Sequence, residues 1–100
     1  MSYTSEVHTV WERINVSSSE TSGIYEVGTS EKLEYHIRVH SAGSGGTITL
    51  EHSALKEPGS FAPVGTARNL NSAQNYTEGF DHFLPYVRFN MSGVTACAIG

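Results

Sequence analysis

The chain has 100 residues, 38% hydrophobic and 16% charged, with a formal net charge of −4. This length suits one domain, and the composition excludes a disordered chain and a helical bundle rich in Leu, Lys and Glu. The acidic balance argues against sequence-independent binding to nucleic acid, and no apolar run approaches the roughly 20 residues that span a membrane.

The N-terminal segment, residues 1–6, is short, polar and unpatterned, with Tyr3 as its large side chain. It has neither the basic nor the apolar region of a secretory signal, so we expect none. We predict an N-terminal arm over residues 1–6 and one β-sandwich domain over residues 7–100. Termini often contact partners, so Tyr3 is a candidate contact residue.

Apolar and polar residues alternate with a period of two along four segments, which is typical of half-buried antiparallel strands. The segments are 33–40, 47–51, 87–91 and 94–98. Short turn signals rich in Ser, Gly, Asn and Pro separate them, and no segment has a convincing helical period. The pattern predicts an all-β, antiparallel, jelly-roll-like sandwich of about eight short strands.

Two hairpins can be registered from this alternation. In the first, Ile37 lies opposite Leu50 across the glycine-rich loop 41–46; in the second, Phe89 lies opposite Ala96 across Ser92-Gly93. The glycines of both loops would supply positive φ angles. The second register predicts one buried two-stranded face, made by Val87, Phe89, Met91, Val94, Ala96 and Ala98.

His36 and His40 invite a metal-site interpretation because they lie four residues apart. On a strand, however, this spacing separates them by roughly 13 Å, whereas two zinc ligands must each lie about 2 Å from one ion. We therefore predict no structural metal. His36, Arg38 and His40 are expected to form a solvent-facing row, with His36 opposite Glu51. A pH-sensitive contact surface is the alternative role for this row, since imidazole titrates near neutrality.

Catalytic patterns are weak, so we predict no catalytic residues and no enzymatic activity. The chain has no Gly-x-Ser-x-Gly motif and no phosphate-binding loop. Asp81 and His82 are adjacent and would point to opposite faces of a strand, and Cys97 is expected to be a buried thiol. The loop from Lys56 to Pro63, with Phe61, is a better candidate for partner contact.

Four segments together resemble small β-sandwich virion proteins of tailed bacteriophages, which are capsid decoration, head-tail or tail components. They are Thr21–Tyr25, Gly46–Ser53, Phe61–Gly65 and Pro85–Asn90. The resemblance implies a non-enzymatic structural protein of the virion, most of all a capsid decoration (cement) protein that bridges capsid subunits. It implies a homotrimer that binds the major capsid protein or other virion proteins. From composition we expect neither nucleic acid nor membrane as a partner, and we predict no cofactor.

Two other functions stay open. The same sandwich occurs in carbohydrate-binding modules, so a carbohydrate- or receptor-binding module of a phage tail is the first alternative. A small metal-dependent β-barrel enzyme is the second.

Overall fold

A computed structural model describes residues 10, 14–16, 19–27, 32–94 and 97–100 of the chain. The predicted arm 1–6, with Tyr3, lies outside the described residues. In the described part, no helix is long and apolar enough to cross a membrane. The elements are β1 (Ile14–Val16), β2 (Glu20–Thr21), β3 (Tyr25–Glu26), β4 (Leu33–Ser41), β5 (Thr47–Ser53), the 3-10 helix η1 (Pro58–Ser60), β6 (Ala62–Pro63), β7 (Arg68–Asn69), β8 (Asn75–Phe80), β9 (Tyr86–Ser92) and β10 (Cys97–Ile99).

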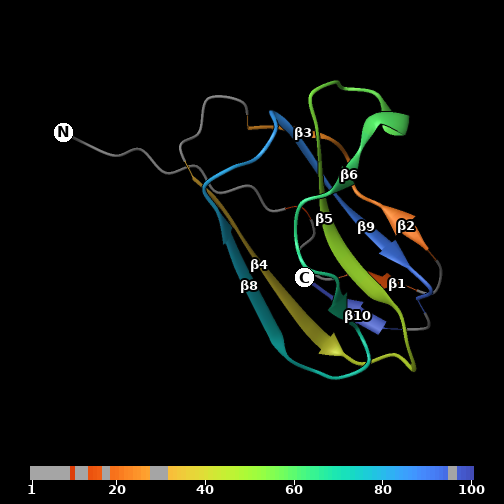
Figure 1. Ribbon diagram of the computed structural model, residues 1–100. Coiled ribbons are helices and arrows are strands. Elements are labelled where there is room, and N and C mark those ends of the chain that lie inside the picture. Colours follow the sequence, from red (N-terminus) through yellow and green to blue (C-terminus); the bar gives the residue numbers. More distant parts are fainter. Residues whose placement is uncertain (1–9, 11–13, 17–18, 28–31, 95–96) are drawn as a thin grey trace.

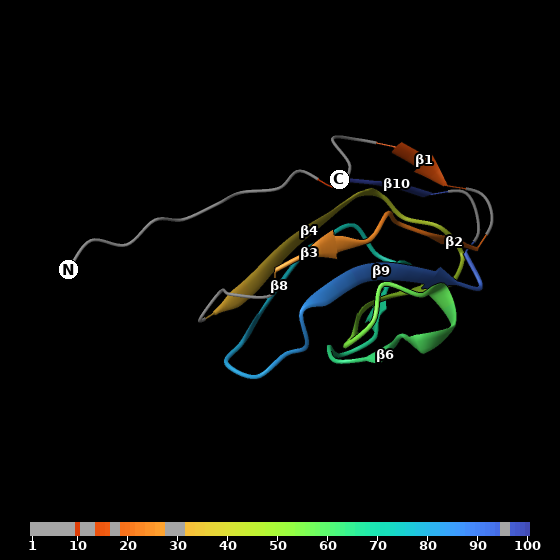
Figure 2. The same ribbon diagram turned by 90° about the horizontal axis from the view of Figure 1, so that it is seen from above.

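The strands form two antiparallel sheets that pack face to face. The first sheet has the order β1-β10-β4-β8. The second has the order β2-β9-β5-β6, with β3 also pairing β9 and β7 also pairing β5. Viewed from above, β1, β10 and β4 lie in one layer and β9 and β6 in the other (Figure 2). The predicted all-β antiparallel sandwich is confirmed.

The strand order is that of a jelly roll. Because β2 and β3 share the partner β9, and β6 and β7 share the partner β5, the ten strands occupy eight positions. Along the chain, successive positions alternate between the two sheets except where β5 leads into β6 and β7. This connectivity is the jelly-roll pattern of eight strands in two sheets. It accounts for both the predicted fold and the predicted number of strands.

The first predicted hairpin is wrong. β4 and β5 lie in different sheets, so Ile37 pairs with Tyr76 of β8, and Leu50 pairs with Phe89 of β9. Ile37 and Leu50 do both point into the core, and both are buried. They belong to opposite layers of the sandwich rather than to neighbouring strands. His36 accordingly lies opposite Thr77, not opposite Glu51.

The second predicted hairpin is also wrong, because β9 and β10 belong to different sheets. Val87, Phe89, Met91 and Val94 are buried as predicted, whereas Ala96 lies outside the described residues. At β10 the predicted alternation of inward and outward residues is wrong. All three residues of β10 are buried, and Cys97 and Ile99, rather than Ala98, belong to the apolar cluster between the sheets.

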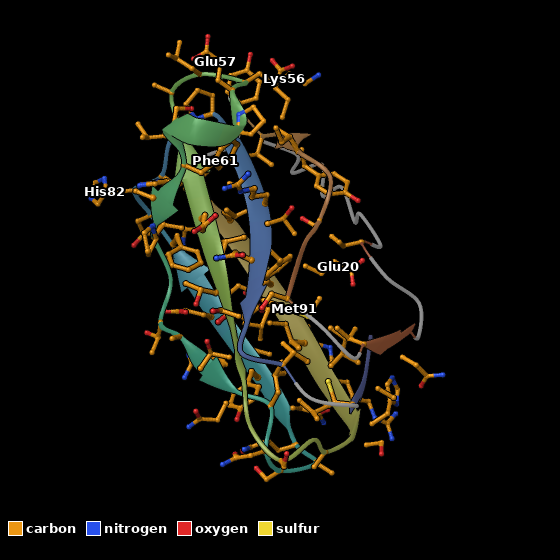
Figure 3. The ribbon with its side chains drawn as sticks, turned by 90° about the vertical axis from the view of Figure 1, so that its right-hand side faces the viewer. Glu20, Lys56, Glu57, Phe61, His82 and Met91 are labelled. Atoms are coloured by element: carbon orange, nitrogen blue, oxygen red, sulfur yellow. The ribbon has the colours of Figure 1, made fainter. Side chains whose placement is uncertain are left out.

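Apolar side chains from both sheets fill the space between them. Met91 of β9 is fully buried and points into this space (Figure 3). Phe89 and Tyr35 come from opposite sheets and meet edge to face, with ring centroids 5.5 Å apart. The buried cluster comprises Val16, Tyr35, Ile37, Val39, Ile48, Leu50, Leu70, Val87, Phe89, Met91, Val94, Cys97 and Ile99.

Two glycines allow the inter-sheet connections to approach closely. Gly46 has a φ of 102° and Gly93 a φ of 65°, as the sequence predicted for these loops. A Cβ atom on Gly46 would lie 2.7 Å from the Cα of Val94. The carbonyl of Gly46 also accepts a hydrogen bond from the N–H of Leu70, at 3.0 Å. Gly46 therefore joins three connections at one end of the sandwich.

Candidate functional site

The outer face of β4 and β8 carries the predicted row of His36, Arg38 and His40, called here the basic row. β4 alternates strictly, with Tyr35, Ile37 and Val39 buried and Glu34, His36 and Arg38 exposed. His40 is half-buried at the end of this row, beside the register shift between β4 and β10. His36 and Arg38 thus project from a strand whose other face is fixed by the core.

The β8 side chains opposite this row are small and uncharged. In register, Glu34 faces Gly79, His36 faces Thr77 and Arg38 faces Asn75. All three β8 residues are exposed. The side chains of His36 and Arg38 therefore extend beyond those of their β8 neighbours, which leaves both accessible to a large partner. Glu34 shares this exposed face, so its positive charge is confined to the end of the row at Arg38, beside His36, and that end is the part suited to an acidic surface.

The outer face of the opposite sheet carries a nearly buried ion pair. Arg88 Nε lies 2.9 Å from Glu51 Oε1, and the two side chains are only 15% and 10% exposed. The Arg88 guanidinium also lies 4.4 Å from the centroid of the Phe61 ring. Phe61 lies at the same end of the molecule as Lys56 and Glu57 (Figure 3). The contact holds the 54–63 loop against the sheet, which is a structural role.

A third polar cluster joins the two sheets along one open side of the sandwich. Arg68, on β7, donates from Nε to the hydroxyl of Tyr35 on β4, at 3.2 Å. The Tyr35 hydroxyl in turn donates to Glu78 Oε1 on β8, at 2.9 Å. Thr66 donates to the same carboxylate from its backbone N–H and its hydroxyl. We call Tyr35, Thr66, Arg68 and Glu78 the inter-sheet bridge.

The environment of the inter-sheet bridge shifts the pKa values of Tyr35 and Glu78. Burial raises the pKa of Tyr35, which keeps its hydroxyl protonated and able to donate. Burial also acts to raise the pKa of Glu78, but the hydrogen bonds from Thr66 and Tyr35 and the charge of Arg68 outweigh it and leave this pKa below its usual value. Glu78 is therefore held as a carboxylate that accepts several hydrogen bonds.

The structure does not bring all the predicted contact residues together. His36, Arg38 and His40 share one outer face, as expected. Phe61 lies over Arg88 on the outside of the other sheet, and Tyr3 lies outside the described residues. The predicted set therefore divides into a basic row on one sheet and an aromatic contact on the other.

The sequence pattern did not predict the ion pair of Glu51 and Arg88 or the inter-sheet bridge. Glu51 and Arg88 face each other only because β5 pairs with β9, and this pairing was not predicted. Arg68 occupies a two-residue strand that shows no alternation. The alternation in the sequence places Glu51 and Arg88 at outward positions, but only the jelly-roll connectivity makes β5 and β9 neighbours.

The remaining reactive residues lie in two places, Cys97 on β10 and the adjacent Asp81 and His82 after β8. Cys97 is buried, and burial raises the pKa of its thiol. Asp81 and His82 are exposed in the connection between β8 and β9, and His82 points outward (Figure 3). Within the described ranges, no group of three or more His, Cys, Asp or Glu residues is placed to hold a metal ion.

No protein family, curated protein or solved structure matches the chain.

Proposed function

We propose that this chain is a non-enzymatic structural protein of a virus particle, which attaches to the assembled capsid shell as a decoration protein. The outer face of β4 and β8 is the attachment surface, and His36 and Arg38 are its central contacts. The occupant is an acidic area of the shell, recognised by charge complementarity.

The observation that carries this proposal is the accessible basic row on a rigid sheet. The inward face of β4 packs in the core, so the side chains of His36 and Arg38 are presented at fixed spacing. Binding sites on regular strands are positioned more accurately than sites on loops. A flat surface of this kind fits the broad face of another protein.

The filled interior supports a binding role over an enzymatic one. A site that encloses a small substrate needs a concave pocket with convergent polar groups. Here the inward positions of β4, β5 and β9 are occupied by apolar side chains such as Ile37, Leu50 and Met91. The polar groups near the interior belong to the inter-sheet bridge, whose hydrogen bonds are internal to the chain.

Multivalency supplies the mechanism. A single small interface binds weakly, but many copies on one shell each link neighbouring subunits and together raise the free energy needed to disrupt the shell. Because the contact is partly electrostatic, binding is expected to weaken as salt concentration rises.

Cosedimentation with undecorated shells tests this proposal. The shells are assembled without decoration protein from the major capsid protein of the same virus. The intact protein is expected to pellet with shells at 50 mM salt and to dissociate progressively toward 500 mM salt. Absence of binding, together with specific retention on a glycan array, would instead support the carbohydrate-binding alternative.

A further inference from the structure

β8 forms one margin of the first sheet (Figure 1). It pairs with β4 over six residues, and no other strand in the described part of the chain pairs with its second edge. An edge strand with unpaired backbone groups is a template for a further strand. The partner that this edge fits must therefore present an extended backbone.

The groups that β8 directs outward can be assigned. The N–H of Val39 donates to the carbonyl of Gln74, at 2.8 Å. Hydrogen-bonded and non-hydrogen-bonded pairs alternate along an antiparallel ladder. Asn75, Thr77 and Gly79 therefore point their backbone N–H and C=O groups away from β4, toward the free edge.

Several of the usual devices that prevent edge pairing are missing along β8, and the one that is present, an inward-pointing charge, is hydrogen-bonded within the chain. Residues 75–80 contain no lysine and no proline, and the register with β4 is regular throughout. The one charged residue of β8, Glu78, points inward to the inter-sheet bridge. Among the described residues, a Cβ atom on Gly79 would meet the carbonyl oxygen of Leu33, at 3.8 Å, so the outer face of the strand is uncrowded there.

We propose that β8 pairs antiparallel with β8 of a second copy of this chain, about a two-fold axis through Thr77. In this register Thr77 faces its own counterpart, and Asn75 faces Gly79 of the partner subunit. Every outward N–H and C=O group of the three residues then has a partner. A threonine pair at the axis is a favourable cross-strand contact.

The charge pattern selects this register over its neighbours. Residues whose side chains face the core must pair with core-facing residues of the partner subunit. The two-fold axis therefore passes through a residue, because an axis between two residues would pair core-facing with solvent-facing positions. An axis through Glu78 would place two carboxylates opposite each other, which is unfavourable. An axis through Tyr76 would pair Gly79 with Ala73 of the partner subunit, outside the strand. The axis through Thr77 avoids both problems.

The pairing joins the first sheets of two copies into one continuous sheet. Both basic rows then lie on the same outer face, because His36 and Thr77 share that face. The dimer is a property of the chain itself and does not depend on the proposed shell binding. It differs from the homotrimer that the resemblance implies, and the mass in solution distinguishes the two.

Charge substitution at the axis tests the proposal. Sedimentation equilibrium of the unmodified protein is expected to give twice the 10.8 kDa chain mass. Thr77→Lys and Thr77→Glu each place like charges opposite each other, and each is expected to raise the dimer dissociation constant about threefold or more. An equimolar mixture of the two variants restores dimerisation, because lysine then faces glutamate.

Asn75→Lys is the matched control, since this exposed position faces Gly79 of the partner subunit rather than its own counterpart. It is expected to change the dissociation constant less than Thr77→Lys does. Amide hydrogen exchange gives a second readout on the unmodified protein: the Thr77 amide becomes protected as concentration rises. A mass of one or three chains at all concentrations, or a mixture that associates no better than its components, would overturn the proposal.

Discussion

Arg68 and Tyr35 lie on opposite sheets of the sandwich, and the guanidinium of Arg68 donates a hydrogen bond to the hydroxyl of Tyr35, at 3.2 Å. The Tyr35 hydroxyl donates a hydrogen bond to Glu78, which also accepts hydrogen bonds from Thr66. The two layers are therefore joined by directional bonds as well as by apolar packing. This inter-sheet bridge lies at the side where β7 and β8 are the marginal strands.

Removing the hydroxyl of Tyr35 tests the inter-sheet bridge. Tyr35→Phe keeps the ring packed against Phe89 but leaves Arg68 and Glu78 without their common partner. Loss of a hydrogen bond of this kind is expected to cost about 0.5–1.5 kcal/mol of unfolding free energy. Urea denaturation measures it. A double-mutant cycle with Arg68→Met should show positive coupling between the two residues, and strict additivity would contradict the bridge.

Glu78 is expected to make stability depend on pH in the acid range. Its pKa in the folded state is lower than the ordinary value of 4.5, so the folded state favours the carboxylate. The resulting stabilisation is present above pH 4.5 and is lost as pH falls through the lowered pKa. Glu78→Gln should flatten the stability curve below about pH 4.5 in urea titrations. An unchanged slope in this variant would show that other carboxyl groups cause the acid sensitivity.

The sequence was sufficient to predict which residues of the long strands point inward. In β4 and β9 the alternation of apolar and polar residues matches the observed burial. It could not predict the neighbouring strand, because alternation reports the face of a residue and not its partner. In a jelly roll most successive strands change sheet, so the assumption that adjacent segments form hairpins fails even where each segment is recognised correctly.

The candidate sites were predictable to different degrees for the same reason. The basic row of His36 and Arg38 lies within one strand, so local alternation was enough to place it on an outer face. The pair of Glu51 and Arg88 and the inter-sheet bridge are assembled from distant segments. Alternation also fails to predict the faces of β10, because all three of its residues are buried.

Phe89 and Asn90 are a matched pair of neighbouring positions on β9. Phe89 points into the core, whereas Asn90 points to the outer face and lies opposite Thr49. Phe89→Ala is expected to cost about 3–5 kcal/mol of unfolding free energy, and Asn90→Ala less than about 0.5 kcal/mol. Chemical denaturation followed by circular dichroism measures both. Equal, small losses would contradict the orientation of β9.

Gly46 and Gly93 are expected to differ in their tolerance of alanine. Gly93→Ala places a side chain at a φ of 65° and at an ordinary contact distance of 3.9 Å from the Cα of Gly46, which costs about 1 kcal/mol. Gly46→Ala adds a collision with the backbone of Val94 to an unfavourable φ of 102°. It should therefore lower the thermal midpoint more than Gly93→Ala does. The reverse order would mean that these two connections do not approach each other as described.

The proposed attachment surface for the capsid shell is the outer face of β4 and β8. Arg38→Glu reverses a charge at the middle of this face, while Lys56→Glu makes the same charge change on the exposed loop at another part of the surface (Figure 3). Both positions are exposed, so both variants are expected to fold normally.

The most direct measurement is the cosedimentation of these two variants with undecorated shells at 50 mM salt. We expect Arg38→Glu to weaken shell binding at least tenfold, on the order of the penalty for placing a like charge against an acidic partner surface. Lys56→Glu should bind as the unmodified protein does. Equal binding by both variants, or a loss with Lys56→Glu alone, would contradict attachment through the face of β4 and β8.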